Sequence, residues 1–272
     1  MTIESYKRDV NHKTLIMGIL NCTPDSFSDG GRYDSIYRQM NKARELKTEG
    51  ADIIDIGGES TRPGYTPVSA EQELARILPI VRILSEQNIY VSVDTTKPEV
   101  AAKCAEAGCR LINDIGGDLK NSGMAEIAAA NGTGLVIMFN ARNKESDTEI
   151  VERAKKELSE NIEYALAKGV PEEKIIVDPG VGFGTTREED IALIRNIDKF
   201  SFDGKFATLC AVSRKRVIRQ LYDWGDDLDL ADDASDSVAI YCISRGASLV
   251  RTHRSGRLRL KLDVYDGLLS EK

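Results

Sequence analysis

Eight short apolar runs recur along the chain, and a longer stretch with helical spacing follows each of them. The runs are Leu15–Leu20, Ile53–Ile56, Tyr90–Val93, Arg110–Ile112, Gly134–Met138, Ile175–Val177, Phe206–Cys210 and Ser248–Thr252. They are continuously apolar rather than alternating, which is typical of strands buried on both faces of a parallel sheet. The pattern therefore predicts a parallel α/β fold built from eight βα units.

The stretches between these runs have the spacing of amphipathic helices. We expect helices near Ser35–Glu49, Ala70–Glu86, Lys97–Ala107, Met124–Asn131, Asp147–Lys168, Arg187–Asn196, Arg214–Tyr222, Asp233–Arg245 and Arg257–Leu269. Five of them end at a glycine, as helix C-caps often do: Gly50, Gly108, Gly132, Gly169 and Gly246. Eight units in 272 residues favour one domain over residues 1–272, a TIM (β/α)8 barrel, with an open doubly wound sheet as the alternative.

Composition narrows the class of protein further. A net charge of −7 argues against nucleic acid as the main partner, although a local cation cluster can still bind a small anion. The five cysteines form no C-x-x-C motif, and two histidines make a histidine-based metal site improbable. We see no signal peptide and no membrane span, so we expect a cytoplasmic protein.

Seven of the eight predicted strands are followed by a carboxylate, an amide or a cation. One aspartate after a strand is ordinarily a turn or N-cap residue. In an α/β barrel, however, the active site lies where the C-terminal ends of the strands meet. We therefore expect one site that combines buried carboxylates, an amide and a cationic side.

Two long motifs resemble the signatures of dihydropteroate synthases. The first is Met-Gly-Ile-Leu-Asn-Cys-Thr-Pro-Asp-Ser-Phe-Ser-Asp-Gly-Gly at 17–31, and the second is Gly-Ala-Asp-Ile-Ile-Asp-Ile-Gly-Gly-Glu-Ser-Thr-Arg-Pro-Gly at 50–64. Shorter segments match in order and spacing: 94–95, 112–115, 178–184, 213–215 and Arg251-x-His253. The resemblance covers essentially the whole chain. It implies a transferase that condenses 6-hydroxymethyl-7,8-dihydropterin diphosphate with p-aminobenzoate and releases pyrophosphate, in folate biosynthesis.

The resemblance also implies roles for individual residues, a Mg²⁺ cofactor and a homodimer. The pterin site would comprise Asp94, Asn113, Met138, Asp178 and Lys215. Asn21, Arg62, Arg251 and His253 would serve the diphosphate, with Asn21 as the metal ligand. Thr61, Arg62, Pro63, Phe183 and Arg216 would line the p-aminobenzoate site. Asp94, Lys215, Arg251 and His253 would take part in catalysis.

Physical chemistry agrees with these implied roles. The carboxylate of Asp178 can accept two parallel N–H groups of a pterin ring, and Asn113 offers both a donor and an acceptor. Arg251 and His253 lie two apart on an extended segment and point to the same side. An ionised Asp94 can stabilise the positive charge that develops as the leaving group departs. Structural alternatives remain for single residues: packing for Phe183, surface exposure for His253 and a solvated helix start for Lys215.

The chain departs from the family pattern mainly around the second substrate. Arg216 stands where the family has a small serine, Phe139 where it has a histidine, and Arg254 where it has an aspartate. Arg216 would either pair with the acceptor's carboxylate or crowd its pocket, and we favour crowding because the three changes suggest a rim reshaped as a unit. The alternatives to the synthase are a paralogue with another acceptor, a non-catalytic pterin-binding protein and a methyltetrahydrofolate-dependent methyltransferase domain.

Overall fold

The eight strands form a closed parallel barrel in chain order. The structure, a computed structural model, describes residues 5–8, 13–23, 32–60, 66–142 and 148–269. The strands are β1 Leu15–Asn21, β2 Ile53–Gly57, β3 Val91–Asp94, β4 Leu111–Asp114, β5 Gly134–Met138, β6 Ile175–Asp178, β7 Ala207–Cys210 and β8 Leu249–Thr252. β8 pairs with β1 from Leu15↔Leu249 to Gly18↔Thr252, which closes the sheet. The TIM barrel is confirmed, and the open sheet is wrong.

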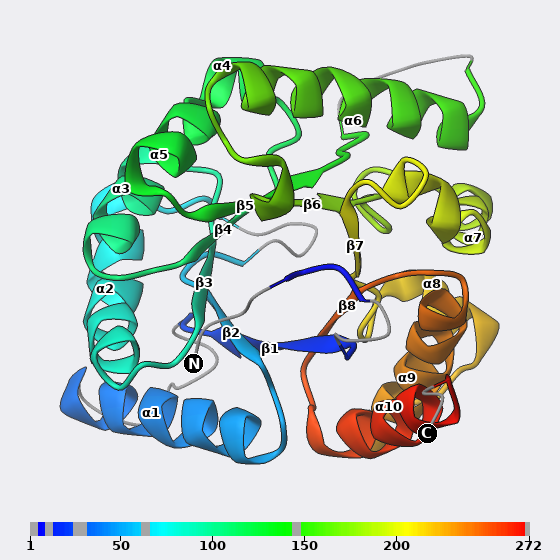
Figure 1. Cartoon of the computed structure of the whole chain (residues 1–272). Helices are drawn as coiled ribbons and strands as arrows, with labels where there is room; N and C mark the ends of the chain where they lie inside the picture. The colour runs from blue at the N-terminus through cyan, green and yellow to red at the C-terminus, as the bar shows by residue number, and fades with distance from the viewer. Residues whose placement is uncertain (1–4, 9–12, 24–31, 61–65, 143–147, 270–272) are drawn as a thin grey trace.

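Helices surround the barrel on its outer face (Figure 1). They are α1 Arg32–Thr48, α2 Ala70–Glu86, α3 Pro98–Glu106, α4 Leu119–Ser122, α5 Met124–Asn131, α6 Ile150–Ala167, α7 Arg187–Arg195, α8 Arg216–Leu221, α9 Leu228–Ser244 and α10 Gly256–Leu269. Two short 3₁₀ turns, Glu172–Lys174 and Ile197–Ser201, precede β6 and β7. Among the residues described, no helix is long and apolar enough to cross a membrane.

The element boundaries differ from the predicted ones in two instructive ways. α9 begins at Leu228 rather than Asp233, because the Asp227 carboxylate accepts hydrogen bonds from the backbone N–H groups of Asp229 and Leu230. Strands β1, β3, β4 and β6 run one or two residues further than the apolar runs. The polar residues expected just after those strands are therefore their last residues, held in sheet register.

Glycine ends the predicted helices as expected. Gly50, Gly108, Gly132, Gly169 and Gly246 all have positive φ, between 63° and 102°. That conformation favours glycine because a Cβ would clash with the backbone. Each of these residues turns the chain from a helix toward the next strand, so the sequence signal for the helix ends is confirmed.

The barrel interior is apolar in its lower part and polar in its upper part. Inward-facing side chains near the strand starts form one buried cluster: Leu15, Met17, Ile53, Leu111, Val136, Ile176, Ala207, Leu209 and Leu249, with Tyr6, Tyr90 and Ala211. Because side chains alternate along a strand, the next inward positions lie one layer higher. On β2, β3, β4, β6 and β8 these positions are Asp55, Asp94, Asn113, Asp178 and Arg251.

A segment near the N-terminus lies against the start of the barrel. Tyr6 is buried within the interior apolar cluster, and its hydroxyl shares a hydrogen bond with that of Tyr90, just before β3. The two rings meet edge to face, with centroids 6.4 Å apart. Tyr6 therefore helps close the N-terminal end of the barrel, opposite the polar layer.

Candidate active site

Arg251 on β8 lies between two carboxylates at the C-terminal end of the barrel. Its Nε donates to Asp55 Oδ2 at 2.6 Å, and its Nη2 donates to Asp94 Oδ2 at 2.6 Å. Asp55 is fully buried, and the side chains of Asp94 and Arg251 are 10% and 18% exposed. One guanidinium thus joins β2, β3 and β8 across the barrel through charge-assisted hydrogen bonds.

Asn113 on β4 belongs to the same cluster. Its Nδ2 donates to Asp55 Oδ2 at 3.1 Å, while its Oδ1 is buried and has no hydrogen-bond partner among the residues described. We expected Asn113 to offer a ligand both a donor and an acceptor. One N–H of Nδ2 is engaged by Asp55, because a carboxylate can only accept, and the amide has a second N–H besides its free Oδ1.

Asp178 and Lys215 form the other side of the polar layer. Asp178 Oδ1 accepts the N–H of Gly180 at 2.7 Å, and Lys215 Nζ donates to the carbonyl oxygen of Val181 at 2.6 Å. Lys215 Nζ also lies 4.7 Å from the ring centroid of Phe183. Met138, at the end of β5, is buried beside Phe183 in a small apolar cluster that also contains Ile115. The segment after β6 therefore holds the lysine above the strand ends.

Burial shifts the pKa values of two of these groups toward neutral pH. It raises the pKa of the Asp94 carboxyl to about 7; Arg251 opposes the shift and the nearby Asp55 adds to it. It lowers the pKa of the Lys215 ammonium to about 8, although Asp178 opposes that shift. It also raises the pKa of Asp178, against the effect of Lys215. Perturbed titration of grouped residues at a barrel's C-terminal end is typical of a functional site.

The loop between β6 and α7 is shaped by glycines and one buried carboxylate. Gly180, Gly182 and Gly184 have φ of 76°, 81° and 81°. Asp190 on α7, which is almost fully buried, accepts from the N–H of Gly182 at 2.7 Å and from the Thr185 hydroxyl at 2.5 Å. These contacts fix the loop that carries Phe183.

His253 follows β8 and is oriented by Ser213, which follows β7. Ser213 Oγ lies 2.9 Å from His253 Nδ1 and accepts the backbone N–H of His253 at 3.3 Å. Since the hydroxyl accepts from the backbone, its own proton can point to Nδ1, an arrangement that favours a proton on Nε2. The neighbouring Arg214, at φ 57°, forms a bidentate ion pair with Asp232 at 2.7 and 2.8 Å.

The three residues that depart from the family pattern lie in different places. Arg216 Nη2 donates to the carbonyl oxygen of Thr185 at 3.0 Å. Arg254 pairs with Asp229 on α9. Phe139 is 1% exposed and packs in the cluster between barrel and helices, with its ring centroid 5.5 Å from the guanidinium carbon of Arg153. The idea of a rim reshaped as a unit is therefore wrong for Phe139, because its side chain faces the helices.

The remaining predicted residues are less constrained by the structure. Asn21 ends β1 and pairs in register with Gly57 on β2, next to Asp94. A Cβ built on Gly57 would lie 4.0 Å from both Asn21 Oδ1 and Asp94 Oδ2. Thr61, Arg62 and Pro63 lie outside the described residues. In the described part of the chain, no group of three His, Cys, Asp or Glu residues could hold a metal ion.

Sequence reasoning missed Asp55 and Asp190. Asp55 contacts two predicted site residues, and Asp190 supports the loop of a third. A signal for Asp55 was present, since a carboxylate inside the run Ile53–Ile56 is costly unless it is paired. No comparable signal marked Asp190, which lies among exposed acidic residues at the start of a helix.

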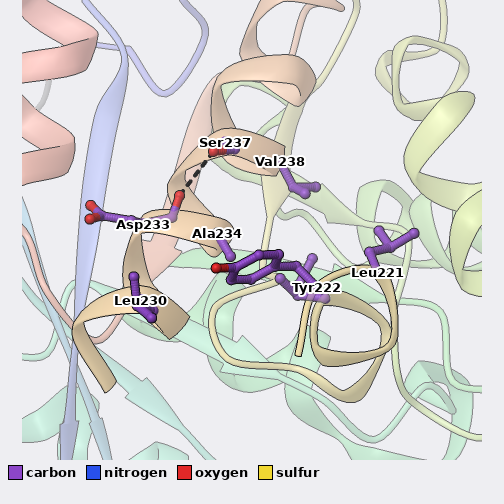
Figure 2. Close-up of a pocket in the computed structure, with 8 residues that line it drawn as sticks. Leu221, Tyr222, Leu230, Asp233, Ala234, Ser237 and Val238 are labelled. Atoms are coloured by element: carbon purple, nitrogen blue, oxygen red, sulfur yellow. Dashed lines mark hydrogen bonds between the residues drawn. The ribbon is translucent and has the colours of Figure 1, made fainter. Parts of the chain in front are cut away.

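A cavity of about 430 Å³ lies elsewhere, on the outer face between α8 and α9. Figure 2 shows Tyr222 and Leu221 on one side and Leu230, Asp233, Ala234, Ser237 and Val238 on the other. The lining is mostly apolar and includes none of the predicted site residues. This cavity is separate from the polar cluster at the strand ends.

Comparison with known proteins agrees with this geometry. The sequence profile of a family described as pterin binding enzymes matches residues 17–253. The dihydropteroate synthase of Bacillus subtilis (strain 168) is 39% identical over 270 residues, which are 98% of this chain and 91% of the relative. That of Clostridium beijerinckii is 43% identical over 219 residues, 80% of this chain and 81% of the relative.

Solved structures are similar as well. A dihydropteroate synthase from Clostridium difficile, determined in the presence of pteroic acid, matches with a TM-score of 0.91 and 33% identity, over 99% of this chain and 100% of that chain. One from Xanthomonas albilineans with 4-aminobenzoic acid matches with a TM-score of 0.89 and 32% identity, over 97% and 95% of the two chains.

Proposed function

The chain belongs to the family of pterin-binding enzymes that includes the dihydropteroate synthases, and on that premise we propose how its own residues perform the family's reaction. The protein is a transferase that joins p-aminobenzoate to 6-hydroxymethyl-7,8-dihydropterin diphosphate in folate biosynthesis. The amine attacks the pterin methylene carbon, the carbon–oxygen bond to the diphosphate breaks, and pyrophosphate leaves while the amine loses a proton. The polar layer of Asp94, Asn113, Asp178, Lys215 and Arg251 above an apolar floor is the observation that carries the assignment.

We propose that the pterin ring lies against this polar layer. Asp178, which already accepts one backbone N–H, has lone pairs left for ring donors. Lys215 and Met138 lie on the same side, and Asp94 faces the position where positive charge develops on the methylene. Preorganised charge of this kind stabilises a transition state without reorganisation during the reaction.

We assign the diphosphate to the side of Arg251 and His253, with Asn21 and Arg62 as further contacts. The Ser213 hydroxyl on Nδ1 leaves the ring proton of His253 on Nε2, and this N–H suits an anionic leaving group. Mg²⁺ usually binds few protein oxygens and takes the rest from substrate phosphates and water. The single amide oxygen of Asn21 at the barrel rim fits such an ion, which would neutralise charge on the departing pyrophosphate.

We propose that the second substrate lies beside Phe183, with Thr61 and Pro63 along its route. The Arg216 guanidinium, held by the Thr185 carbonyl two residues beyond Phe183, supports pairing with the acceptor's carboxylate over crowding. Replacing it in Arg216→Ser should raise the KM for p-aminobenzoate, by about fivefold for a part-exposed pair of roughly 1 kcal/mol. Steady-state kinetics test this. A KM that falls would restore the crowding hypothesis, and an unchanged KM would place Arg216 outside the acceptor site.

A product assay tests the proposed function as a whole. The protein is incubated with the pterin diphosphate and Mg²⁺, with and without p-aminobenzoate, and the products are separated by chromatography. We expect dihydropteroate and pyrophosphate only when p-aminobenzoate is present, and loss of turnover when Mg²⁺ is chelated. Consumption of the diphosphate without p-aminobenzoate incorporation would point instead to a different acceptor.

We also propose a cytoplasmic homodimer with one domain over residues 1–272. Leu221, Tyr222, Leu228 and Leu230 expose large apolar side chains around the cavity between α8 and α9, and such patches are typical of protein interfaces. The five cysteines are all buried and form no disulfide, which supports the cytoplasmic location because thiols stay reduced there. Sedimentation analysis tests the dimer: Leu221→Lys should shift the protein to monomer, and a wild-type monomer would refute the proposal.

A further inference from the structure

Asp55 is a carboxylate in the middle of an otherwise apolar strand. It lies on β2 in register with Ile19 and Ser92, one inward position above Ile53 and one below Gly57. Its side chain is fully buried. An ionised carboxylate at this depth is stable only when it is paired and hydrogen-bonded, so its contacts indicate what it does.

Asp55 Oδ2 accepts hydrogen bonds from two different site residues. Arg251 Nε donates at 2.6 Å and Asn113 Nδ2 donates at 3.1 Å. The nitrogen of the amide must face the carboxylate, because a carboxylate cannot donate. The opposite orientation would set two acceptors against each other. Asp55 therefore fixes the orientation of the Asn113 amide, with one N–H on the carboxylate and Oδ1 directed away from it.

The orientation leaves Asn113 Oδ1 as a buried acceptor with no partner in the described part of the chain. A buried unpaired acceptor is costly, and an N–H group of a bound ligand would satisfy it. The Asp55 carboxylate accepts from Nε of Arg251, while Asp94 accepts from its Nη2. Asp55 can thus keep Arg251 in place when Asp94 engages a substrate.

We propose that Asp55 is a positioning residue that orients the Asn113 amide so that its Oδ1 accepts from a ring N–H donor, and that aims Arg251 at the diphosphate side of the site. This proposal rests on the proposed function, and it specifies the polarity of pterin recognition. A ligand that sets an acceptor against Asn113 Oδ1 would be rejected.

The Asp55 charge also acts on Asp94, which gives the proposal a distinctive signature. The negative charge of Asp55 contributes to the raised pKa of Asp94, and Arg251 opposes it. Neutralising Asp55 should remove its repulsion of the Asp94 carboxylate. It should also leave Asp94 as the one charged carboxylate of the two that hydrogen-bond to Arg251. Both effects lower the pKa of Asp94, whereas general damage to the barrel would not shift it in a defined direction.

The test compares Asp55→Asn with the matched control Asp52→Asn. Asp52 is also a buried, ion-paired carboxylate; it contacts Arg259 at 3.2 Å and accepts the N–H of Ile16 at 2.9 Å, just before β2 begins. Calorimetry with 6-hydroxymethylpterin should show that Asp55→Asn binds this ligand at least about tenfold more weakly than the wild type. Asp52→Asn should bind it with the wild-type affinity. The acidic limb of kcat/KM should move to lower pH in Asp55→Asn alone.

The outcomes separate this proposal from the proposed function. Wild-type protein that binds no pterin would defeat the proposed function. Wild-type binding with equal affinity and an unshifted acidic limb in Asp55→Asn would overturn the role of Asp55. If Asp55→Asn does not fold, a crystal structure of the wild type with 6-hydroxymethylpterin decides. Asn113 Nδ2 must then remain on Asp55 with Oδ1 accepting from a ring N–H, and an amide that has turned its Nδ2 away from Asp55 would refute the proposal.

Discussion

Asp94 and Lys215 change charge on either side of a narrow pH range. Burial raises the pKa of Asp94 to about 7 and lowers that of Lys215 to about 8. The carboxylate is ionised only above its pKa, and the ammonium keeps its proton only below its own. Both groups carry the required charge between these values, so the site should be most active there.

We therefore expect a bell-shaped pH dependence of kcat/KM, with limbs near 7 and 8. This parameter reports the essential groups of the free enzyme. Arginine stays charged at all relevant pH values, so Lys215→Arg should lose the alkaline limb in whatever activity remains. A wild-type profile that is flat from about pH 6 to about pH 9.5 would contradict this assignment.

Asp178 is the residue whose substitution should most directly weaken pterin binding. In Asp178→Asn, the amide oxygen can keep the contact to Gly180 N–H, now made by Oδ1 at 2.7 Å. The amide nitrogen would then face the ring donors, so a hydrogen bond would be replaced by two donors that oppose each other. Loss of one partner from a buried charged pair costs about 2–5 kcal/mol. Calorimetry with free pterin measures this, and unchanged affinity would reject the assignment.

At the scale of elements, the loop from β6 to α7 places the site residues with little freedom. Gly180 has φ 76°, and a Cβ built there would lie 1.8 Å from the carbonyl oxygen of Phe139. The same residue donates its N–H to Asp178. A side chain at this position must therefore displace either the loop or the end of β5.

Gly180→Ala should destabilise the protein and impair pterin binding together. Gly204 supplies the matched control: its φ is 79°, but a Cβ there would meet nothing within 4 Å. Gly204→Ala should cost only the backbone penalty of about 1–2 kcal/mol, and Gly180→Ala considerably more. Thermal unfolding compares the two variants. Equal losses would mean that the loop relaxes around the added methyl group.

At the scale of the whole molecule, the two ends of the barrel have separate tasks. The N-terminal end is closed by apolar side chains and the Tyr6–Tyr90 pair, and the C-terminal end carries the charged cluster. In this fold, residues at the N-terminal face serve stability, whereas those at the C-terminal strand ends serve function.

Tyr6→Ala should consequently lower stability without changing pterin recognition. Removing a buried aromatic ring costs about 3–5 kcal/mol, which denaturant unfolding can measure. The KM values of both substrates should stay at the wild-type level, because the polar layer lies beyond the apolar floor. A large change in either KM would show that the two ends are coupled.

Sequence alone predicted a parallel α/β fold of eight units and much of the site, whereas the pairing of β8 with β1 decided between a barrel and an open sheet. Continuous apolar runs between helical stretches have few stable solutions other than a parallel sheet covered by helices, and closure of that sheet brings all strand ends to one rim. Asp94, Asn113, Asp178, Lys215 and Arg251 could therefore be assigned to one site, because their place in the chain predicts their place in space. The glycines that end the helices could also be predicted from the sequence, since positive φ excludes most other residues.

Only the tertiary structure decided how those side chains pair. Hydrogen bonds across the barrel join residues up to 196 positions apart in the chain, as between Asp55 and Arg251, and no local pattern encodes them. One N–H of Asn113 is engaged by Asp55, and packing places Phe139 against the helices. Local periodicity sets which face a residue occupies, but the partner it meets there depends on strands brought together only when the barrel closes.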